Sequence, residues 1–379
     1  MDLGLSETQQ MLKNSARAFL EQECPHSLVR AMEQDQKGYP PELWKSMVDL
    51  GWTGLAFPEK YGGTEGSFLD LAVLIEEMGR ALVPGPFFST VVMGGLTILE
   101  AGSDAQKAEH LPRICQGEET LTMAVTEPSA TFAPGGIQVE ARKDGGDGDY
   151  VIDGTKLFVP DAQTADVIIV AARTSQGANA EDGVTCFIVP ASTQGVSIVP
   201  LDTMASDKQA EVSFSNVKVP AGAVLGEVDK GWPIVDRAIQ RGAAAKCAEM
   251  LGGAGAVLEM TVEYAKQRVQ FGRPIGSFQA VQHHCANIAT YAESSRYMAY
   301  QAAWSVSEGL PAAREVSMAK AWVSEAYRKA CLLAHQSHGA IGFTQEHDLQ
   351  LFTRRARVAE LAYGDPKFHR ELVAESIGI

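Results

Sequence analysis

The sequence contains no run of about 18 apolar residues, so it predicts no membrane-spanning helix. Its N-terminus, MDLGLSETQQMLK, also lacks the apolar segment of a secretory signal peptide. The six cysteines are scattered, and none forms a Cys-x-x-Cys pair with another. This spacing is typical of reduced thiols in a cytoplasm rather than of a disulfide framework. We therefore expect a cytoplasmic protein without a membrane span.

Several common classes of function have no support in the sequence. Neither a G-x-S-x-G motif nor a Walker A motif occurs, so nothing indicates a hydrolase or a nucleoside triphosphatase. The run GGAGAV at residues 252–257 follows a helical pattern rather than a strand, which excludes a Rossmann dinucleotide-binding motif. A formal net charge of −15 argues against nucleic acid or an anionic membrane as the main partner.

Two pairs of histidines are candidates for a metal site, His283 with His284 and His335 with His338. Neither pair has a carboxylate or another third ligand at the spacing that a metal site requires. We therefore expect solvated or hydrogen-bonded histidines and no metal.

The 379 residues divide into three regions with different patterns. Helical periodicity prevails in the first region, and long helical patterns fill the last. Between them, short segments rich in β-branched residues are bounded by Gly, Pro, Asp and Asn, which predicts an antiparallel sheet or a small barrel. The sequence therefore predicts an α+β protein with a helical domain over 1–118, a β domain over 119–228 and a helical domain over 229–379.

Some elements are predicted in more detail. Ser6 followed by Gln9 indicates a capping box at the start of the first helix. VTCFIVP at residues 184–190 is a predicted strand, and residues 279–307 are a predicted helix. Three glycines within the last helical region imply the close approach of a neighbouring helix or of a ligand: Gly252, Gly253 and Gly255.

The connection between two long helical patterns, YAKQRVQFGRPIGSFQ at residues 264–279, holds an unusual set of side chains. Arg268, Arg273, Phe271, Phe278 and Gln279 are more than a short polar turn needs. Guanidinium groups bind phosphate oxygens in a bidentate manner, and aromatic rings stack on flat groups. The segment is therefore suited to a phosphate-bearing ligand with a flat ring. The alternative is a surface turn in which one arginine caps a helix.

Two further loops carry candidate motifs. TEP at Thr126 to Pro128 opens the β region. HGAIGFTQEHDLQLFTRR at residues 338–355 joins glycines to a polar turn and a basic helix, and Gln336 and Gly339 would let backbone groups approach a cofactor. Taken alone, a plain turn explains the first motif and a helix cap the second.

In their order and spacing, these motifs resemble the acyl-CoA dehydrogenase family of flavoproteins over essentially the whole chain. The resemblance implies an N-terminal helical domain, a central β domain and a C-terminal four-helix bundle, usually assembled as a tetramer. It implies FAD between the β domain and the bundle, with the adenine end reaching the neighbouring subunit. The implied reaction removes the α proton of an acyl-CoA thioester while the β hydrogen leaves as hydride.

The resemblance assigns cofactor contacts to individual residues. Arg268 resembles the family arginine that pairs with the FAD pyrophosphate across the subunit boundary. Phe271 and Gln279 correspond to its companions beside the adenosine. Thr126 corresponds to the residue near the pyrimidine edge of the isoalloxazine ring, and Phe158 stands where the family usually has a tryptophan against the flavin face.

Other positions depart from the family pattern. Gln336 and Gly339 match a Q-x-x-G-G motif that contacts the flavin nucleotide of the other protomer, but Ala340 replaces its second glycine. Pro160 replaces a family threonine whose hydroxyl would hydrogen-bond flavin N5. Proline cannot make this hydrogen bond, because it offers neither a hydroxyl nor an N–H. The run SATFA at residues 129–133 replaces the usual G-x-G-S-D.

The catalytic base is the largest departure. The two positions where the family places a glutamate fall at Tyr363–Gly364 and at Gly242, and neither holds a carboxylate. Asp365 is the best candidate for the base; the alternative is that it caps the helix that begins near Pro366. Arg241 either binds a ligand anion or makes a salt bridge. The glycines at both base positions would leave room for a bulky or cyclic acyl group.

We expect an FAD-dependent acyl-CoA dehydrogenase-like oxidoreductase of fatty acid or lipid metabolism, which passes its electrons to electron-transfer flavoprotein. It would form a homotetramer, or a heterotetramer with a related acyl-CoA dehydrogenase subunit that carries the glutamate. Two alternatives stay open. One is a flavoprotein that performs a non-oxidative elimination on acyl-CoA, as in the loss of sulfite from sulfinopropionyl-CoA. The other is a non-catalytic subunit of a mixed tetramer.

Overall fold

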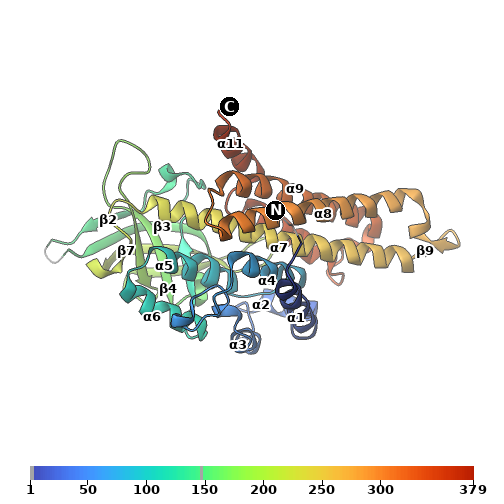
Figure 1. Ribbon diagram of the computed structural model, residues 1–379, viewed down its shortest axis with the longest axis horizontal. Helices are drawn as coiled ribbons and strands as arrows, with labels where there is room; N and C mark the ends of the chain where they lie inside the picture. The colour runs from blue at the N-terminus through green and yellow to red at the C-terminus, as the bar shows by residue number, and fades with distance from the viewer. Residues whose placement is uncertain (1–3, 146–147) are drawn as a thin grey trace. The chain divides into compact units, whose positions relative to one another are not determined.

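The computed structural model describes residues 4–145 and 148–379. Residues 1–3 and 146–147, from the predicted N-terminal and central domains, lie outside the described residues. The chain divides into two compact units. We call Met1–Ala31, Ser67–Val83 and Ala243–Ile379 the helical unit, and Met32–Gly66 and Pro84–Gly242 the sheet unit. Helix α7, at Trp232–Gln267, crosses from the second unit into the first along the sequence (Figure 1).

Among the described residues, an eight-stranded sheet forms the centre of the sheet unit. Its strands are β1 (Leu121–Ala124), β2 (Glu140–Lys143), β3 (Tyr150–Pro160), β4 (Val167–Arg173), β5 (Val184–Pro190), β6 (Val196–Leu201), β7 (Gln209–Val219) and β8 (Val224–Leu225). The spatial order is β6-β7-β3-β2-β4-β5-β8, with β1 beside β4. All pairs are antiparallel except β1 with β4 and β2 with β4. The predicted antiparallel sheet is confirmed, with two parallel pairings added.

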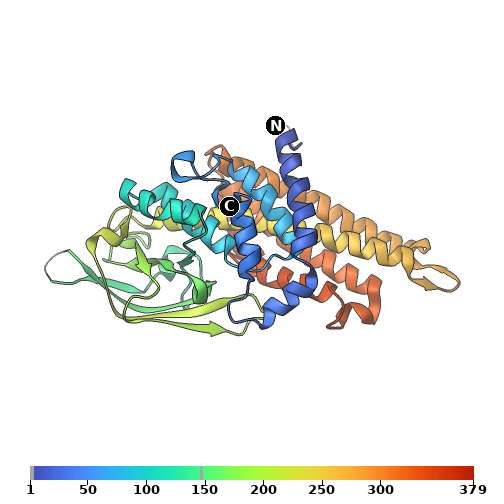
Figure 2. The same ribbon diagram turned by 90° about the horizontal axis from the view of Figure 1, so that it is seen from below.

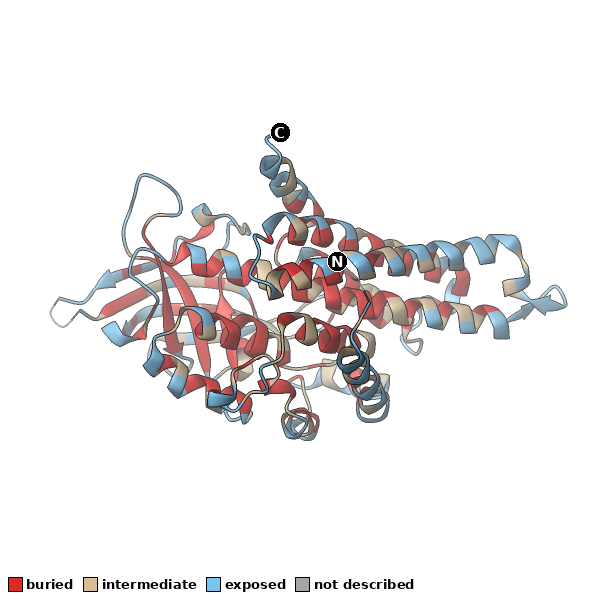
Figure 3. Cartoon of the chain, in the orientation of Figure 1, coloured by how far each residue is buried: buried red, intermediate tan, exposed pale blue. Residues whose placement is uncertain are grey.

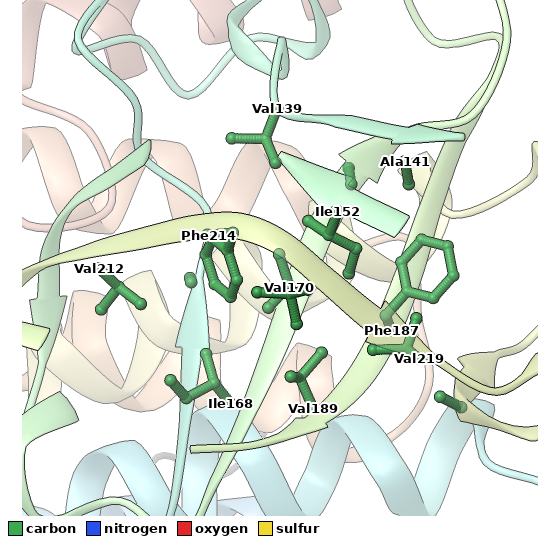
Figure 4. Close-up of a cluster of buried hydrophobic side chains, with 14 of the residues drawn as sticks. Val139, Ala141, Ile152, Ile168, Val170, Phe187, Val189, Val212, Phe214 and Val219 are labelled. Atoms are coloured by element: carbon green, nitrogen blue, oxygen red, sulfur yellow. The ribbon is translucent and has the colours of Figure 1, made fainter. Parts of the chain in front are cut away.

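An apolar cluster of this unit is built from side chains that share one face of the strands. Figure 4 shows side chains from β4, β5 and β7 that point toward one another, among them Ile168, Val170, Phe187, Val189, Val212 and Phe214. In each strand these residues occupy alternate positions, because successive side chains of a strand point to opposite faces. Each such buried side chain contributes about 1.5–3 kcal/mol to stability.

The helical unit is built around α9, at Ala313–His338, which contacts α8, α10 and α11. Besides residues 243–267 of α7, the unit contains α1 (Glu7–Glu23), α4 (Phe68–Ala81), α8 (Gln279–Ser307), α10 (Leu349–Leu361) and α11 (Pro366–Ser376). Four more precede the sheet in sequence: α2 (His26–Gln34), α3 (Pro41–Asp49), α5 (Leu96–Ala101) and α6 (Asp104–Cys115). Within the described part of the chain, no helix is both long and apolar enough to cross a membrane.

Several predicted boundaries are confirmed. The Ser6 hydroxyl accepts the Gln9 N–H and the Gln9 side chain accepts the Ser6 N–H, which completes the capping box. Helix α8 and strand β5 have the predicted bounds. Between α7 and α8 a hairpin, labelled β9, projects beyond the helix ends (Figures 1 and 2). Figure 3 shows that its residues are exposed.

The glycines of α7 confirm the expectation of close packing at two of three positions. A Cβ at Gly252 would overlap the Glu76 carbonyl oxygen of α4. A Cβ at Gly253 would lie 2.6 Å from Cζ of Tyr327 in α9. A Cβ at Gly255, in contrast, would meet no described atom within 4 Å. Close helix contact therefore explains Gly252 and Gly253 but not Gly255.

We predict that Gly252→Ala lowers the free energy of unfolding by about 2–3 kcal/mol, because the methyl group must push α4 away from α7. Gly255→Ala is the matched control in the same helix, and we expect it to raise stability by up to about 1 kcal/mol through helix propensity. Urea unfolding of the two variants measures both effects. A shift of the same sign in both variants would contradict the packing argument.

Candidate functional site

The hairpin between α7 and α8 has an unusual turn. Strands β9 (Val269–Gln270) and β10 (Arg273–Pro274) pair antiparallel, and Phe271 and Gly272 connect them. The two turn residues have φ angles of 54° and 78°, as a type I′ turn requires. A side chain at the first position costs about 1–2 kcal/mol, so Asn or Gly is usual there. Phe271 adopts this conformation nevertheless, and its side chain is 91% exposed.

Cationic and aromatic groups surround this turn. The Arg273 guanidinium lies 4.2 Å from the centroid of the Phe278 ring. The Phe271 and Phe278 rings meet edge to face with centroids 6.0 Å apart. Arg268 and Gln279 are exposed, and their side chains make no hydrogen bond or ion pair with any described residue. The hairpin therefore offers a free guanidinium and aromatic rings to a ligand with phosphates and a flat ring.

The end of α9 lies beside the end of α7. Tyr264, in the last turn of α7, stacks on the ring of His338 with centroids 4.5 Å apart. Gln336, Gly339 and Ala340 are exposed. Gly339, which caps the C-terminus of α9, has a φ of 68°, and a Cβ there would meet no described atom within 4 Å. The fold thus brings the residues predicted beside the adenosine and those predicted at the flavin nucleotide of the other protomer to the same end of the helical unit.

Two buried histidines next to this segment each keep one nitrogen without a partner. His335 Nε2 is 2.7 Å from Thr353 Oγ1, and His338 Nδ1 donates to the Ala334 carbonyl oxygen at 2.8 Å. His335 Nδ1 and His338 Nε2 are buried and unpaired within the described residues. Burial lowers the pKa of both imidazoles. Hydrogen-bonded histidines are thus confirmed, and their free nitrogens fit a segment that receives a polar ligand.

No group of three or more His, Cys, Asp or Glu side chains that could hold a metal ion occurs in residues 4–145 and 148–379. The chemistry of the exposed groups on the hairpin and at the end of α9 instead fits an aromatic dinucleotide.

Thr126 and Phe158, predicted beside the flavin ring, lie on adjoining segments of the sheet unit. The Thr126 carbonyl oxygen accepts the Leu157 N–H at 2.8 Å. Phe158 has a φ of 55°, lies in a bulge where the register of β3 with β7 shifts, and is 51% exposed. Backbone strain of this kind, with an exposed ring, is typical of functional sites. The Pro160 carbonyl oxygen accepts the Thr122 hydroxyl at 2.6 Å.

A buried ion pair, which the sequence analysis missed, lies behind these two residues. Lys156 Nζ donates to Glu127 Oε1 at 2.7 Å and to the Val125 carbonyl oxygen at 3.0 Å. Glu127 also accepts the N–H groups of Gln138 and Val139 at 2.9 and 3.1 Å. Burial lowers the pKa of Lys156 to about 8, although Glu127 opposes the shift. The available signal was a lysine inside the largely apolar strand segment VIDGTKLFV.

Gly364, where the resemblance implies a glutamate, has no space for a side chain. It is buried with a φ of 102°. A Cβ there would overlap the Phe368 ring and lie 2.8 Å from His369 Nε2. The expectation that Gly364 leaves room for a bulky acyl group is therefore wrong, because side chains of α11 fill that space. Asp365 Oδ1 accepts the Phe368 N–H at 2.8 Å, which confirms the helix cap; its role as a base stays a prediction.

A lysine and a histidine, both buried, hold the turn at Gly364. Lys320 Nζ donates to the Gly364 carbonyl oxygen at 2.9 Å and to a carbonyl oxygen of α10 at 3.0 Å. His369 Nε2 donates to the Tyr363 carbonyl oxygen at 2.9 Å, so Nδ1 accepts from the Ser317 hydroxyl at 3.2 Å. Burial lowers the pKa of Lys320 to about 8 and that of His369 to about 4.

Arg241 makes the salt bridge that was one of its two predicted roles. Its guanidinium pairs with Glu100, which also pairs with Arg237, and donates to Thr97 Oγ1 at 2.9 Å. Burial lowers the pKa of Arg241 to about 10. Arg241 Nε is buried without a partner among the described residues. Gly242 beside it is buried. Anion binding by Arg241 and acyl binding at Gly242 stay predictions.

The chain matches the family models of the acyl-CoA dehydrogenase N-terminal domain at residues 6–118, middle domain at 122–217 and C-terminal domain at 229–378. A probable acyl-CoA dehydrogenase of Bacillus subtilis is 33% identical over 384 residues, which cover 100% of both chains.

Two further relatives cover nearly all of the chain. Subunit CarC of the caffeyl-CoA reductase–Etf complex of Acetobacterium woodii is 29% identical over 97% of this chain and 98% of its own. The solved structure of butyryl-CoA dehydrogenase from Megasphaera elsdenii has a TM-score of 0.92 and 31% identity over 100% of both chains. These likenesses confirm the predicted fold.

We predict that His369 makes the protein sensitive to acid. Its folded-state pKa of about 4 lies below its ordinary value of 6.5. As the pH falls, His369 therefore binds a proton in the unfolded chain before it does so in the folded protein. The free energy of unfolding drops by about 3 kcal/mol between the unfolded-state pKa and the folded-state pKa. Urea unfolding over this range should show a flatter profile for His369→Gln than for the wild type. The exposed His283→Gln is the control, and parallel profiles in all three proteins would contradict the prediction.

Proposed function

Because the chain belongs to the acyl-CoA dehydrogenase family, we propose that it catalyses the α,β-desaturation of an acyl-CoA thioester. Members of this family are FAD-binding oxidoreductases that act on the CH–CH bonds of acyl-CoA. The observation that carries the proposal is the match of all three family domains, in order, along one chain. The proposed domain boundaries are those expected from the sequence, after residues 118 and 228.

The proposed FAD site uses the exposed groups described above. Arg268 would pair with the pyrophosphate, and Phe271 and Gln279 would lie beside the adenosine. The flavin nucleotide of the other protomer would contact a second group of residues: Gln336, Gly339 and Ala340. Thr126 and Phe158 would line the isoalloxazine ring. Support comes from the exposure of Phe158 and Phe271, two aromatic residues with positive φ. FAD, when bound, supplies the acceptor for the hydride that leaves the β carbon.

The chain must itself supply the base for the α proton. A general base needs a carboxylate or a comparable group within hydrogen-bond reach of that proton. Asp365 is our candidate, since it follows Gly364 directly and uses only Oδ1 for the helix cap. Arg241 and Gly242 are the proposed contacts of the acyl group, with a bulky or cyclic acyl group favoured only by the glycine at Gly242.

Electron-transfer flavoprotein is the proposed acceptor of the electrons. The support is a relative that functions in a complex with Etf. A tetramer, either of identical subunits or with a related subunit that supplies a glutamate, is proposed because Phe271 exposes an apolar ring on a hairpin tip. We propose a cytoplasmic location on the basis of six unpaired cysteines.

The turn at Gly364 is also compatible with two other functions, an elimination on acyl-CoA and a non-catalytic subunit. The conformation of Gly364 excludes a glutamate side chain at that position, and an elimination on acyl-CoA or a non-catalytic subunit would not require one. Anaerobic addition of acyl-CoA thioesters separates the three. Bleaching of the flavin indicates dehydrogenation, turnover without bleaching indicates elimination, and the absence of both indicates a non-catalytic subunit.

We predict that Asp365→Asn lowers the rate of flavin reduction by an acyl-CoA at least about 100-fold, because the general base is lost. FAD content should stay unchanged. Asparagine is as good an N-cap as aspartate, so the cap of α11 is retained and the thermal midpoint should not move. Stopped-flow absorbance of the flavin measures the rate. Undiminished reduction in Asp365→Asn would remove this residue from the mechanism.

We predict that Arg268→Ala weakens FAD binding roughly 10- to 100-fold and lowers the stability of the tetramer. The physical reason is the loss of charge-assisted hydrogen bonds to the pyrophosphate, worth about 1.5–3 kcal/mol. Arg314→Ala, which removes another exposed arginine of the helical unit, is the matched control. Titration of FAD into the apoproteins and size-exclusion chromatography measure the two effects. Equal FAD affinity in both variants would refute the assignment of Arg268.

A further inference from the structure

The buried pair Lys156–Glu127 is placed to fix two short segments to each other. Glu127 directly follows Thr126, and Lys156 lies two residues before Phe158. The Lys156 ammonium donates to Val125 and to Glu127, so it bonds the residues on both sides of Thr126. The Thr126 carbonyl oxygen in turn accepts the N–H of the residue between Lys156 and Phe158. Three hydrogen bonds therefore join residues 125–127 to residues 156 and 157, which directly precede Phe158.

The pair is also anchored to the core of the sheet unit. Both oxygens of the Glu127 carboxylate accept backbone N–H groups, from Gln138 and from Val139. Val139 belongs to the apolar cluster drawn in Figure 4. Lys156 is fully buried, and Glu127 is 4% exposed. The two segments are thus tied both to each other and to a rigid core, whereas the Phe158 ring stays on the surface.

Stability alone is a poor explanation for this arrangement. Desolvation of two charges offsets most of their attraction, and apolar residues of similar volume are often as stabilising as a buried ion pair. What an ion pair with several hydrogen bonds adds is a defined geometry. Phe158 needs such a constraint, because its φ of 55° is unfavourable for an aromatic residue and persists only when its surroundings enforce it.

We propose that Lys156 and Glu127 are positioning residues of the flavin site: together they set the Thr126 loop and the Phe158 bulge at the spacing that holds the isoalloxazine ring. This inference rests on the proposed flavin contacts of Thr126 and Phe158. Both side chains are buried, so the proposal assigns neither of them a contact with the flavin. Their effect on the flavin is indirect, through the backbone on either side of Thr126 and through the bulge of β3.

The test uses Glu127→Gln, Lys156→Met and the double variant of the full-length protein. Each single change leaves one buried charge unpaired, so we expect both single variants to have lower thermal midpoints. The double variant contains no unpaired charge and should recover most of the lost stability. Its dissociation constant for FAD should nevertheless rise about tenfold, and the absorption spectrum of its bound flavin should shift, because the loop and the bulge are no longer aligned.

Two controls separate positioning from stability. Glu119→Gln removes another buried, paired carboxylate just before β1, where Glu119 contacts His110 and Arg113. It should lower the thermal midpoint and leave the FAD affinity and the flavin spectrum unchanged. Phe158→Ala tests the contact itself, and we expect a shifted flavin spectrum.

A wild-type spectrum and an FAD affinity within about twofold of wild type in the double variant would overturn the inference, provided that Phe158→Ala shifts the spectrum. An unchanged spectrum in Phe158→Ala would overturn the flavin contact, and this inference with it. If the double variant does not fold, Glu127→Gln below its thermal midpoint decides the question by the same two measurements.

Discussion

Two segments of this fold with strained backbone are held by buried ammonium groups that donate hydrogen bonds to backbone carbonyl oxygens. In the sheet unit, Lys156 donates to Val125 and Glu127 and holds the chain on both sides of Thr126. In the helical unit, Lys320 donates to Gly364 and to the last turn of α10. Burial lowers the pKa of each lysine from 10.5 to about 8, which corresponds to a cost on the order of 3 kcal/mol for the charged form. We infer that this desolvation cost is accepted because each buried lysine fixes the conformation of the backbone around it.

Both lysines lie near a residue whose backbone has a positive φ, a conformation that does not occur in a regular strand or helix. Lys156 precedes the left-handed Phe158, and Lys320 bonds the carbonyl of Gly364, whose φ is 102°. Strained conformations of this kind persist only when the surrounding structure enforces them. A charged donor suits this purpose because a charge-assisted hydrogen bond is stronger than a neutral one and cannot be exchanged for water in the interior. The same physical device thus supports a segment proposed at the cofactor and a segment proposed at the base.

The regular strands and helices could be predicted from the sequence, whereas the buried lysines and the strained backbone beside them could not. Strand β5 follows from a short run of β-branched and apolar residues, and helix α8 follows from local helical periodicity; the fold overrides neither. Lys156 was missed because lysine is rarely buried, and no local pattern reveals that Glu127 lies opposite it. The positive φ of Phe158 depends on pairing with β7, a contact distant in sequence. The expected room at Gly364 was wrong because the side chains that fill it come from the following helix.

The turn at Gly364 also limits where the reaction can find its base. The positive φ of Gly364 and the closeness of Phe368 and His369 leave no space for a side chain at this position, so the proposed base lies elsewhere on this chain or on a partner. Asp365 is one residue away, and its Oδ1 is committed to the Phe368 N–H, whereas Oδ2 makes no hydrogen bond with a described residue. The cap and the base therefore need not exclude each other: a carboxylate has two oxygens, one of which fixes the group at the start of α11 while the other remains available to a proton.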